Sequence, residues 1–357
     1  VEMFYGNMND ENVMDDAIWN LLKRRVASAS NDSTIVKMVN YFASSMQDSN
    51  MVNRWSELQG IIEGTEDVYW PQSKALKILA EDLLKKRDSF DWLQVDGDAT
   101  QGLVKEIISK SADKPLSFQN KTVLITGAGP GSIAEAILKD LILAGAKVIV
   151  TTSGLNRERL KSYRKLYQEY SSLGSEMHLV PASQGSRKDI SELLNWCFEA
   201  DLAPDILIPF GAYTEKVPLN MVGQARWSAD MRVMLEGVEC LVTGIADRLG
   251  QSASDQTCGV VIPLSPNHGT FGGDGVYAET KLALEAMIHK RFSEYDFWGS
   301  RMRMIGVSIG WTRGTGLMKG TDSLAGKLES KYGIRTFSNE EMAWLIEALM
   351  SDEIFDL

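Results

Sequence analysis

Hydrophobic and polar residues alternate over residues 121–309 in the manner of an α/β protein. Short, nearly continuous apolar runs recur, as parallel strands buried on both faces of a sheet require. They predict strands at residues 121–126, 147–151, 177–180, 205–209, 259–264 and 302–309. Longer helix-periodic segments lie between them and predict helices at 132–144, 156–173, 186–200, 224–249 and 275–295. Strands and helices in alternation predict a doubly wound parallel sheet, a Rossmann-like α/β fold.

Residues 11–111 have a different pattern, polar and helix-periodic, with apolar stripes at 18–22 and 75–84. This predicts a helical region before the sheet. Its tryptophans are interpreted as packing anchors between helices rather than a cofactor site, because aromatic side chains bury the largest area. We therefore expect three parts: a mainly helical scaffold or linker at 1–117, an α/β domain at 118–319, and a C-terminal helical extension or connector at 320–357.

Charge and composition narrow the class of protein. The chain has 357 residues, with 37 Lys and Arg against 48 Asp and Glu, a formal net charge of −11. Binding to phosphate backbones needs a basic face, so this acidity argues against nucleic acid as a partner. The longest apolar runs fall far short of the roughly 18 to 20 residues that cross a bilayer, so we also expect no membrane partner.

Cysteine and histidine usage argues against structural cross-links. Cys197, Cys240 and Cys258 are widely spaced and form no CxxC motif. This favours a reducing compartment over a disulfide framework or a zinc site, and we expect a cytoplasmic protein. No two histidines are spaced i, i+4, so we expect no metal. The chain begins at Val1 without a signal peptide and is expected to be a piece of something longer.

A glycine-rich turn, Thr126-Gly-Ala-Gly-Pro-Gly-Ser-Ile133, lies between the first predicted strand and the first long helix. A dinucleotide pyrophosphate rests at such a place on backbone N–H groups and a helix N-terminus, and a Cβ would hold the phosphate away. Glycine also serves tight turns for conformational reasons alone. The position after the first strand of an alternating sheet favours cofactor binding.

The end of the second predicted strand carries hydroxyls and no carboxylate, in the segment Val150-Thr-Thr-Ser-Gly-Leu-Asn-Arg157. Dinucleotide sites commonly place Asp or Glu here for a free 2′-hydroxyl, or Arg for a 2′-phosphate. The segment therefore favours NADPH over NADH, with Arg157 at the phosphate. The alternative is that Arg157 and Arg159 lie on the solvated first turn of the next helix, where a cation is electrostatically unfavourable.

Tyr277 and Lys281 form a Tyr-x-x-x-Lys pair at the start of a predicted helix. The i, i+4 spacing puts both side chains on one face, about a turn apart. Reduction of a ketone needs a proton donor for the new alkoxide, and a neighbouring cation lowers the pKa of a phenol. Ser265 ends the fifth predicted strand at the carboxyl edge of the sheet, where ligands gather. Serine, tyrosine and lysine together with the glycine-rich turn indicate a carbonyl reductase.

These residues resemble the short-chain dehydrogenase/reductase family. One branch is more similar: the ketoreductase domain of fungal-type and actinobacterial type I fatty acid synthases, over roughly residues 120–345. The similar blocks are the turn at 126–133, Val150-Thr-Thr-Ser153, Leu264-Ser-Pro-Asn-His-Gly-Thr-Phe-Gly-Gly-Asp-Gly275, Ile309-Gly-Trp-Thr-Arg-Gly-Thr-Gly-Leu-Met318, and Arg335-Thr-Phe-Ser338 followed by Glu341-Met342.

The resemblance implies an NADPH-binding ketoreductase domain at 118–319 that reduces 3-oxoacyl thioesters. It makes Tyr277 the general acid, Lys281 its pKa-lowering partner and ribose ligand, and Ser265 the donor to the carbonyl oxygen. The implied cofactor-binding residues are Gly127, Gly129, Gly131, Ser132 and Ile133 at the pyrophosphate, Thr152, Ser153 and Arg157 at the adenosine phosphate, and Gly310, Trp311, Thr312 and Arg313 at the nicotinamide side. The implied partners are an acyl carrier protein bearing phosphopantetheine and the other domains or subunits of a fatty acid synthase.

The sequence departs from the family pattern at one position of the fourth helix. Many members have an asparagine there that holds a water in a proton relay, and the apparent equivalent is Gly237. A complete four-residue relay is therefore an open question. Gly154 also replaces an arginine of the fungal members, which weakens the implied phosphate clamp.

Other residues near the candidate site have two interpretations each. His268, in the loop after Ser265, is interpreted as holding backbone rather than as a second acid, since Tyr277 already fills that role. Trp311 packs on the cofactor or fills the sheet edge. The glycine-rich stretch at 271–275 is a mobile flap or an ordinary turn.

The leading hypothesis is an NADPH-dependent 3-oxoacyl-thioester reductase within a type I fatty acid synthase. One alternative is a free-standing or polyketide-type reductase acting on another ketone. A carrier domain and a ketosynthase on the same natural chain would discriminate between them. Another alternative is a catalytically silent Rossmann scaffold, against which the joint presence of Ser265, Tyr277 and Lys281 argues.

Overall fold

The computed structural model describes residues 117–355, apart from 173, 214–216, 253–254, 271, 317, 319–321 and 333–334. The helices expected within residues 11–111 lie outside the described residues. Over the described part of the chain the predicted alternation of strands and helices is confirmed. None of the helices described is long and apolar enough to span a membrane.

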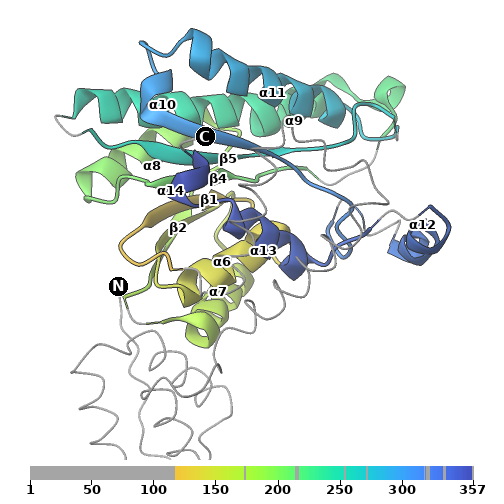
Figure 1. Ribbon diagram of the computed structural model, residues 1–357, viewed down its shortest axis with the longest axis horizontal. Coiled ribbons are helices and arrows are strands. Elements are labelled where there is room, and N and C mark those ends of the chain that lie inside the picture. Colours follow the sequence, from red (N-terminus) through yellow and green to blue (C-terminus); the bar gives the residue numbers. More distant parts are fainter. Residues whose placement is uncertain are drawn as a thin grey trace, which may run out of the picture.

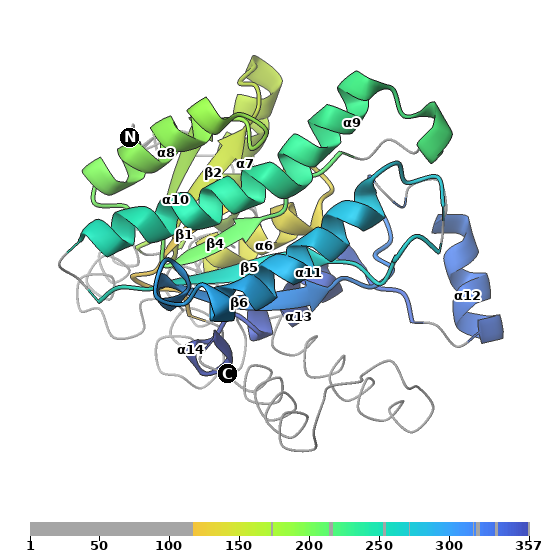
Figure 2. The same ribbon diagram turned by 90° about the horizontal axis from the view of Figure 1, so that it is seen from above.

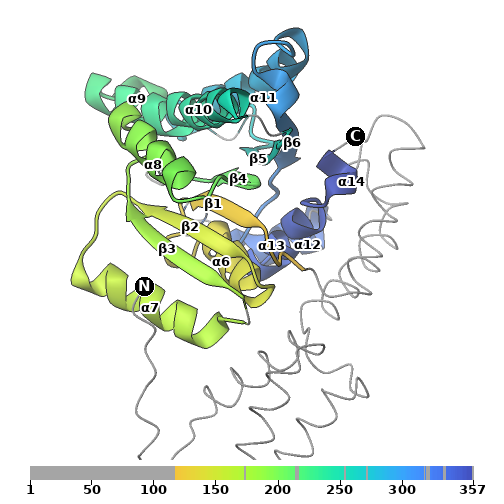
Figure 3. The same cartoon turned by 90° about the vertical axis from the view of Figure 1, so that its left-hand side faces the viewer.

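Six parallel strands form one sheet in the order β3-β2-β1-β4-β5-β6 (Figure 3). The strands are β1 Thr122–Thr126, β2 Lys147–Thr152, β3 Glu176–Pro181, β4 Ile206–Pro209, β5 Cys258–Leu264 and β6 Met302–Ser308. The order reverses between β1 and β4, which lie side by side. Such a reversal opens a crevice at the carboxyl ends of the strands, where ligands of this architecture bind.

Helices cover both faces of the sheet (Figure 1). One face carries α6 Ile133–Leu143, α7 Arg157–Tyr170 and α13 Asn339–Ala348; the other carries α8 Arg187–Glu199, α10 Gly237–Gln251 and α11 Tyr277–Ser293, which run side by side in Figure 2. The remaining helices among the described residues are α9 Gln224–Met231, the π-helix η3 Arg232–Glu236, α12 Ala325–Tyr332 and α14 Asp352–Phe355. Short 3-10 turns are η2 Leu219–Met221, η4 Gly299–Arg301 and η5 Asp322–Leu324.

Local sequence explains where several helices start. The side chains of Ser132, Asn156 and Ser186 each accept a hydrogen bond from a backbone N–H in the first turn of the following helix. Such caps satisfy donors that have no partner inside the helix. They place the first turns of α6 and α7 just beyond the ends of β1 and β2, at the crevice.

The strands differ in burial according to their place in the sheet. β1 and β4 are buried at every residue, whereas β3 is half-exposed and β6 is only partly covered. The expectation that every strand is buried on both faces is therefore wrong for β3 and β6. These are the two edge strands, which have a neighbouring strand on one side only.

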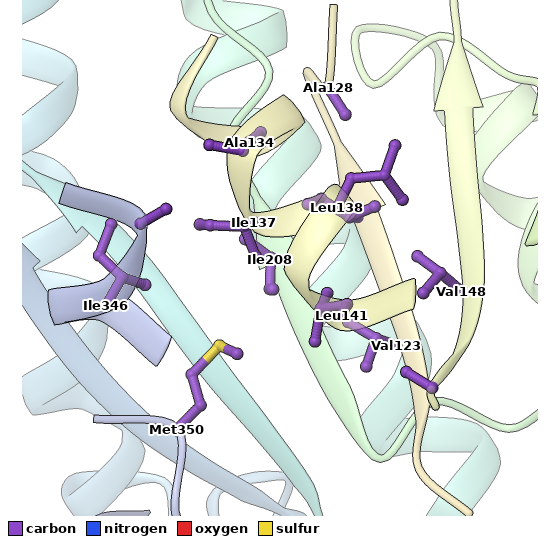
Figure 4. Close-up of a cluster of buried hydrophobic side chains, with 14 of the residues drawn as sticks. Val123, Ala128, Ala134, Ile137, Leu138, Leu141, Val148, Ile208, Ile346 and Met350 are labelled. Atoms are coloured by element: carbon purple, nitrogen blue, oxygen red, sulfur yellow. The ribbon is translucent and has the colours of Figure 1, made fainter. Parts of the chain in front are cut away.

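The C-terminal helix α13 packs along α6 and completes the core on its side of the sheet. Ile346 and the following Met350 lie close to Ile137 and Leu141 of α6 (Figure 4). The helix begins with a capping box in which Ser338 and Glu341 exchange side-chain-to-backbone hydrogen bonds. Residues beyond 319 thus contribute to the hydrophobic core that surrounds β1.

Candidate active site

Ser265, Tyr277 and Lys281 come together at the carboxyl edge of the sheet. Ser265 directly follows β5, Tyr277 is the first residue of α11, and Lys281 lies one turn later on the same helix. The hydroxyl of Ser265 is hydrogen-bonded to the phenol of Tyr277. The Nζ atom of Lys281 lies 5.2 Å from the centroid of the Tyr277 ring. The spacing predicted from the sequence therefore produces one compact cluster.

Lys281 is buried, with 5% of its surface exposed, and its ammonium is held by the backbone. Its Nζ donates a hydrogen bond of 2.6 Å to the carbonyl oxygen of Pro263 in β5. Burial lowers the pKa of Lys281 from 10.5 to about 8, because a low-dielectric environment disfavours the charged amine. The lysine remains mostly protonated at neutral pH and ties the first turn of α11 to the end of β5.

The pKa of Tyr277 is raised above its ordinary value of 10.0, mainly because burial disfavours the phenolate. The hydrogen bond from Ser265 acts in the opposite direction, and the negative charge of Asp274 raises the pKa further. The expectation that Lys281 brings the phenol pKa down towards neutral pH is therefore not met. The physical reason is that desolvation of the phenol outweighs the favourable contacts around it.

The loop between Ser265 and Tyr277 is held at several points. The Ser265 hydroxyl accepts from the backbone N–H of Asn267 at 3.1 Å, and the Asn267 amide donates to the Asp274 carboxylate at 2.9 Å. Near its end, the Gly275 N–H donates to the carbonyl oxygen of Val217 at 2.9 Å. These bonds favour an ordered turn over a freely mobile flap in the described part of the loop.

His268 in this loop faces helix α11. Its Nε2 lies 3.4 Å from a carboxylate oxygen of Glu285, and half of the histidine side chain is exposed. The contact joins the loop to the helix that carries Tyr277. It is in keeping with the structural role expected for His268, which stays a prediction.

The glycine-rich turn has the geometry of a phosphate cradle. Gly127 and Gly131 have φ values of +72° and +76°, which L side chains rarely adopt. A Cβ on Gly127 would lie 2.5 Å from the carbonyl oxygen of Phe210, so the turn rests directly on the loop after β4. A Cβ on Gly129 would meet nothing within 4 Å, which leaves open space over the turn. Ser132 caps α6, so the N-terminus of this helix lies at the turn, where phosphates bind in other proteins.

The N–H groups of Gly131 and Ser132 are already engaged, and that of Ser132 donates to the Gly129 carbonyl oxygen at 3.1 Å. The N–H of Gly131 donates at 2.7 Å to the carboxylate of Glu135, which lies 3.6 Å from the Lys139 ammonium. A cofactor phosphate at the α6 N-terminus would therefore lie near the negative charge of Glu135, which the Lys139 ammonium partly neutralises. The turn, its open space and the helix N-terminus together fit a dinucleotide pyrophosphate.

At the end of β2 the arginine nearest to the strand is Arg159. Its Nη1 donates to the hydroxyl of Thr152 at 3.2 Å and to the carbonyl oxygen of Gly154 at 2.9 Å. Arg157 is exposed at the first position of α7, and Ser153 is exposed after the strand. The structure brings Arg159 rather than Arg157 into contact with the strand end, and the role of this segment at the cofactor stays a prediction.

The loop after β6 is held by the C-terminal region. Backbone hydrogen bonds of 2.8 Å run from the Arg313 N–H to the Phe337 carbonyl and from the Phe337 N–H to the Trp311 carbonyl. Thr312 is buried and its hydroxyl donates to the Gly310 carbonyl at 3.1 Å. The four residues assigned to the nicotinamide side thus lie on a braced loop, and their role stays a prediction.

The sequence was compared with models of known protein families. A family model described as short chain dehydrogenase matches residues 121–323, more than half of the chain. The chain belongs to the short chain dehydrogenase family. It is thus a member of a family of oxidoreductases, and the fold and family expected from the sequence are confirmed.

Solved structures share the fold of this short chain dehydrogenase. A 4-hydroxyisoleucine dehydrogenase complexed with NADH matches with a TM-score of 0.55 and 21% identity, covering 67% of this chain and 94% of that one. A glucose/ribitol dehydrogenase from Brucella melitensis matches with a TM-score of 0.53 and 23% identity, covering 68% and 94%. At these identities the likeness shows the fold alone.

Relatives of higher identity are much longer proteins. Fatty acid synthase subunit alpha of Penicillium patulum is 38% identical over 281 residues, and that of Saccharomyces cerevisiae is 36% identical over 283 residues. Each alignment covers 77% of this chain and 15% of the relative. The short chain dehydrogenase therefore spans about 15% of the length of these relatives.

Three residues of this short chain dehydrogenase were not assigned to the site from sequence. From the sequence, Arg159 was assigned no role at the cofactor, and Gln184 and Asn339 were not singled out. The sequence did contain an indication of Gln184, because glycine destabilises a helix interior and Gly237 therefore suggests a close packing contact there. A Cβ at Gly237 would lie 2.0 Å from the backbone oxygen of Gln184, so the residue at the apparent relay position is small because another segment occupies the space.

Proposed function

We propose that this domain is an NADPH-dependent 3-oxoacyl-thioester reductase that acts within a type I fatty acid synthase. The observation that carries the proposal is the hydrogen-bonded pair of Ser265 and Tyr277 beside the buried ammonium of Lys281. It lies at the crevice of a doubly wound sheet, next to a turn that fits a dinucleotide. The names of the relatives, fatty acid synthase subunit alpha, support the synthase context.

In this proposal Tyr277 donates the proton that completes carbonyl reduction. When bound, NADPH would supply the hydride that adds to the β-carbon of the substrate. The raised pKa of Tyr277 keeps its phenol protonated at neutral pH, ready to donate. The Ser265 hydroxyl donates a hydrogen bond to the same carbonyl oxygen, and the Lys281 cation stabilises the phenolate that forms.

The end of β2 supports NADPH as the cofactor. The guanidinium of Arg159 is fixed by Thr152 and Gly154, which leaves a positive charge beside the strand end. Arginine pairs well with phosphate because its planar donors match the oxygens. We assign the 2′-phosphate to Arg159, with the exposed Arg157 as a second, outer cation. A solved relative of this fold contains NADH, which supports a nicotinamide dinucleotide of either kind.

An exposed apolar rim beside the catalytic loop supports a thioester substrate on a long arm. Leu219, Met221 and Trp227 expose 60%, 69% and 46% of their surface. The neighbouring Val217 pairs with the loop before Tyr277 through the Gly275 hydrogen bond. Apolar side chains at this rim would contact the substrate's acyl and phosphopantetheine segments, with an acyl carrier protein as the partner that delivers them.

The test is oxidation of NADPH with a short 3-oxoacyl thioester, presented both free and on a phosphopantetheinylated carrier protein, with NADH as the comparison. We expect NADPH-dependent turnover, and Tyr277→Phe should reduce kcat about a thousandfold while NADPH binding is retained. Unchanged turnover in Tyr277→Phe would contradict the catalytic assignment. NADPH binding without turnover on either substrate form would indicate a scaffold, and turnover of unrelated ketones alone would indicate another reductase.

A further inference from the structure

Gln184 joins three segments near the carboxyl edge of the sheet. It lies between β3 and α8 and exposes only 8% of its surface. Its amide nitrogen donates to the carbonyl oxygen of Gly211, after β4, at 3.3 Å and to that of Val233, in the π-helix, at 2.6 Å. Its amide oxygen accepts a hydrogen bond from the hydroxyl of Thr126, the last residue of β1. One side chain thus bridges β1, the loop after β4 and the junction of α9 with α10.

These contacts use both hydrogen-bond donors of the amide. A glutamine NH₂ group has two N–H donors, and here each donates to a carbonyl oxygen. A carbonyl oxygen can only accept, so it could not bond to an oxygen placed at the same position. The Thr126 hydroxyl completes the chain, because it accepts from the Gly211 N–H at 3.1 Å and donates to Gln184. The orientation of the amide is therefore fixed by its surroundings, and a carboxylate of the same shape would place an oxygen against the Gly211 and Val233 carbonyls.

The π-helix and Gly237 adapt to the same residue. The Gly237 N–H donates to the Arg232 carbonyl, a bond five residues long that marks the π-turn. Directly beside it, the Gly237 Cα approaches the backbone of Gln184 so closely that a Cβ would be 2.0 Å from the carbonyl oxygen. The helix junction is thus shaped around Gln184, and Gly237 stands at the apparent position of the asparagine that many family members have.

The segments that Gln184 joins are the ones that carry the proposed cofactor site. Gly127 of the glycine-rich turn rests on the Phe210 carbonyl, next to Gly211, and directly follows Thr126. The π-helix packs against α11, which carries Tyr277. A shift of the loop after β4 would therefore move the floor of the glycine-rich turn.

We propose that Gln184 is a positioning residue for dinucleotide binding: its amide fixes the glycine-rich turn, the loop after β4 and the α9–α10 junction relative to one another. The inference rests on the proposed cofactor chemistry. It assigns to Gln184 no contact with the reacting atoms, so its loss should weaken cofactor binding more than it slows the chemical step.

The test is Gln184→Glu, which keeps the shape of the side chain and removes both N–H donors. We expect the Kd for NADPH, measured by fluorescence titration, to rise about tenfold at pH 8, the order expected from lost buried hydrogen bonds. The KM for NADPH should rise in parallel, with kcat changed less than about threefold. At lower pH the Kd for NADPH of the variant should move closer to that of wild type. The introduced carboxyl is then protonated and regains one O–H donor, and its burial raises the pKa at which this happens.

Ser172→Ala is the matched control. The Ser172 hydroxyl makes a buried hydrogen bond of 2.9 Å to the Ile142 carbonyl, before β3 and away from the glycine-rich turn. It should lower the Tm without changing the Kd for NADPH. If Gln184→Glu likewise lowers only the Tm, Gln184 is a fold-stabilising residue and the positioning role is wrong.

A second pair of variants covers the case in which Gln184→Glu does not fold. Thr126→Val removes the hydroxyl that links Gly211 to Gln184, and Thr126→Ser retains it. We expect the valine variant to bind NADPH several-fold more weakly and the serine variant to bind near normally. Equal affinities would overturn the proposal. If the wild-type chain binds neither NADPH nor NADH, the proposed function itself fails, which the variants alone would not show.

Discussion

The side-chain amide of Asn339 donates a hydrogen bond of 3.0 Å to the backbone carbonyl of Gly131. This bond joins the first residue of α13 to the glycine-rich turn, across more than two hundred residues of sequence. The backbone bonds between Phe337 and the loop after β6 lie next to it. The C-terminal region therefore braces both ends of the proposed cofactor site.

Removal of this bond should weaken cofactor binding. In Asn339→Ala the Gly131 carbonyl loses its partner, and we expect a loss of about 1 kcal/mol in NADPH binding, roughly fivefold in Kd. Asn195→Ala, which removes the exposed Arg248 contact on α8 and α10, is the matched control and should leave the Kd unchanged. Equal Kd values for both variants would show that α13 does not support the turn.

Gly237 should tolerate no side chain. Gly237→Ala places a Cβ 2.0 Å from the backbone oxygen of Gln184, and backbone cannot move aside cheaply. We expect the free energy of unfolding to fall by about 3 kcal/mol, as for severe overpacking. Gly250→Ala, on the same helix with open space around its Cα, should instead gain roughly 0.5–1 kcal/mol. Chemical denaturation measures both, and a tolerated alanine at Gly237 would refute the close approach.

Arg159 should decide between the two nicotinamide cofactors. Arg159→Ala removes the cation beside Thr152, and we expect the Kd for NADPH to rise about tenfold while that for NADH changes little. Arg157→Ala, at the exposed start of α7, should have a smaller effect on NADPH. Titration of each variant with both cofactors measures this. If Arg157→Ala raises the Kd for NADPH more than Arg159→Ala does, the 2′-phosphate is bound by Arg157, as first predicted from the sequence.

Glu347 should make stability depend on pH. Its carboxyl is fully buried in α13 beside Asp140 of α6, and burial, followed by the Asp140 charge, raises its pKa well above 4.5. The unfolded chain releases this proton near pH 4.5, whereas the folded protein retains it. Stability contributed by the neutral carboxyl is therefore present below that pH and is lost as the pH rises through the folded pKa.

Glu347→Gln removes this dependence. We expect the variant to be more stable than wild type at pH 7, with the difference in the free energy of unfolding shrinking towards pH 4. Glu340→Gln, in the exposed first turn of α13, is the control and should show no comparable pH-dependent gain. Thermal melts over this pH range test it, and a constant difference at all pH values would mean that Glu347 does not titrate in the way described.

The sequence by itself determined the sheet, its helices and the three residues of the proposed reaction. Parallel strands need continuous apolar runs, and the i, i+4 spacing of Tyr277 and Lys281 fixes their shared helix face. Ser265 could be added because carboxyl ends of parallel strands meet at one edge. These are consequences of local pattern and chain connectivity.

Only the tertiary structure decided the contacts between distant segments. Arg159, rather than Arg157, contacts the end of β2, because its position in the first turn of α7 directs its side chain towards Thr152 and Gly154. Burial, and not the neighbouring lysine, dominates the pKa of Tyr277. Gln184 and Asn339 bridge segments far apart in sequence, and no periodicity records which backbone carbonyl a side chain will meet. Such contacts follow from packing, which depends on all elements at once.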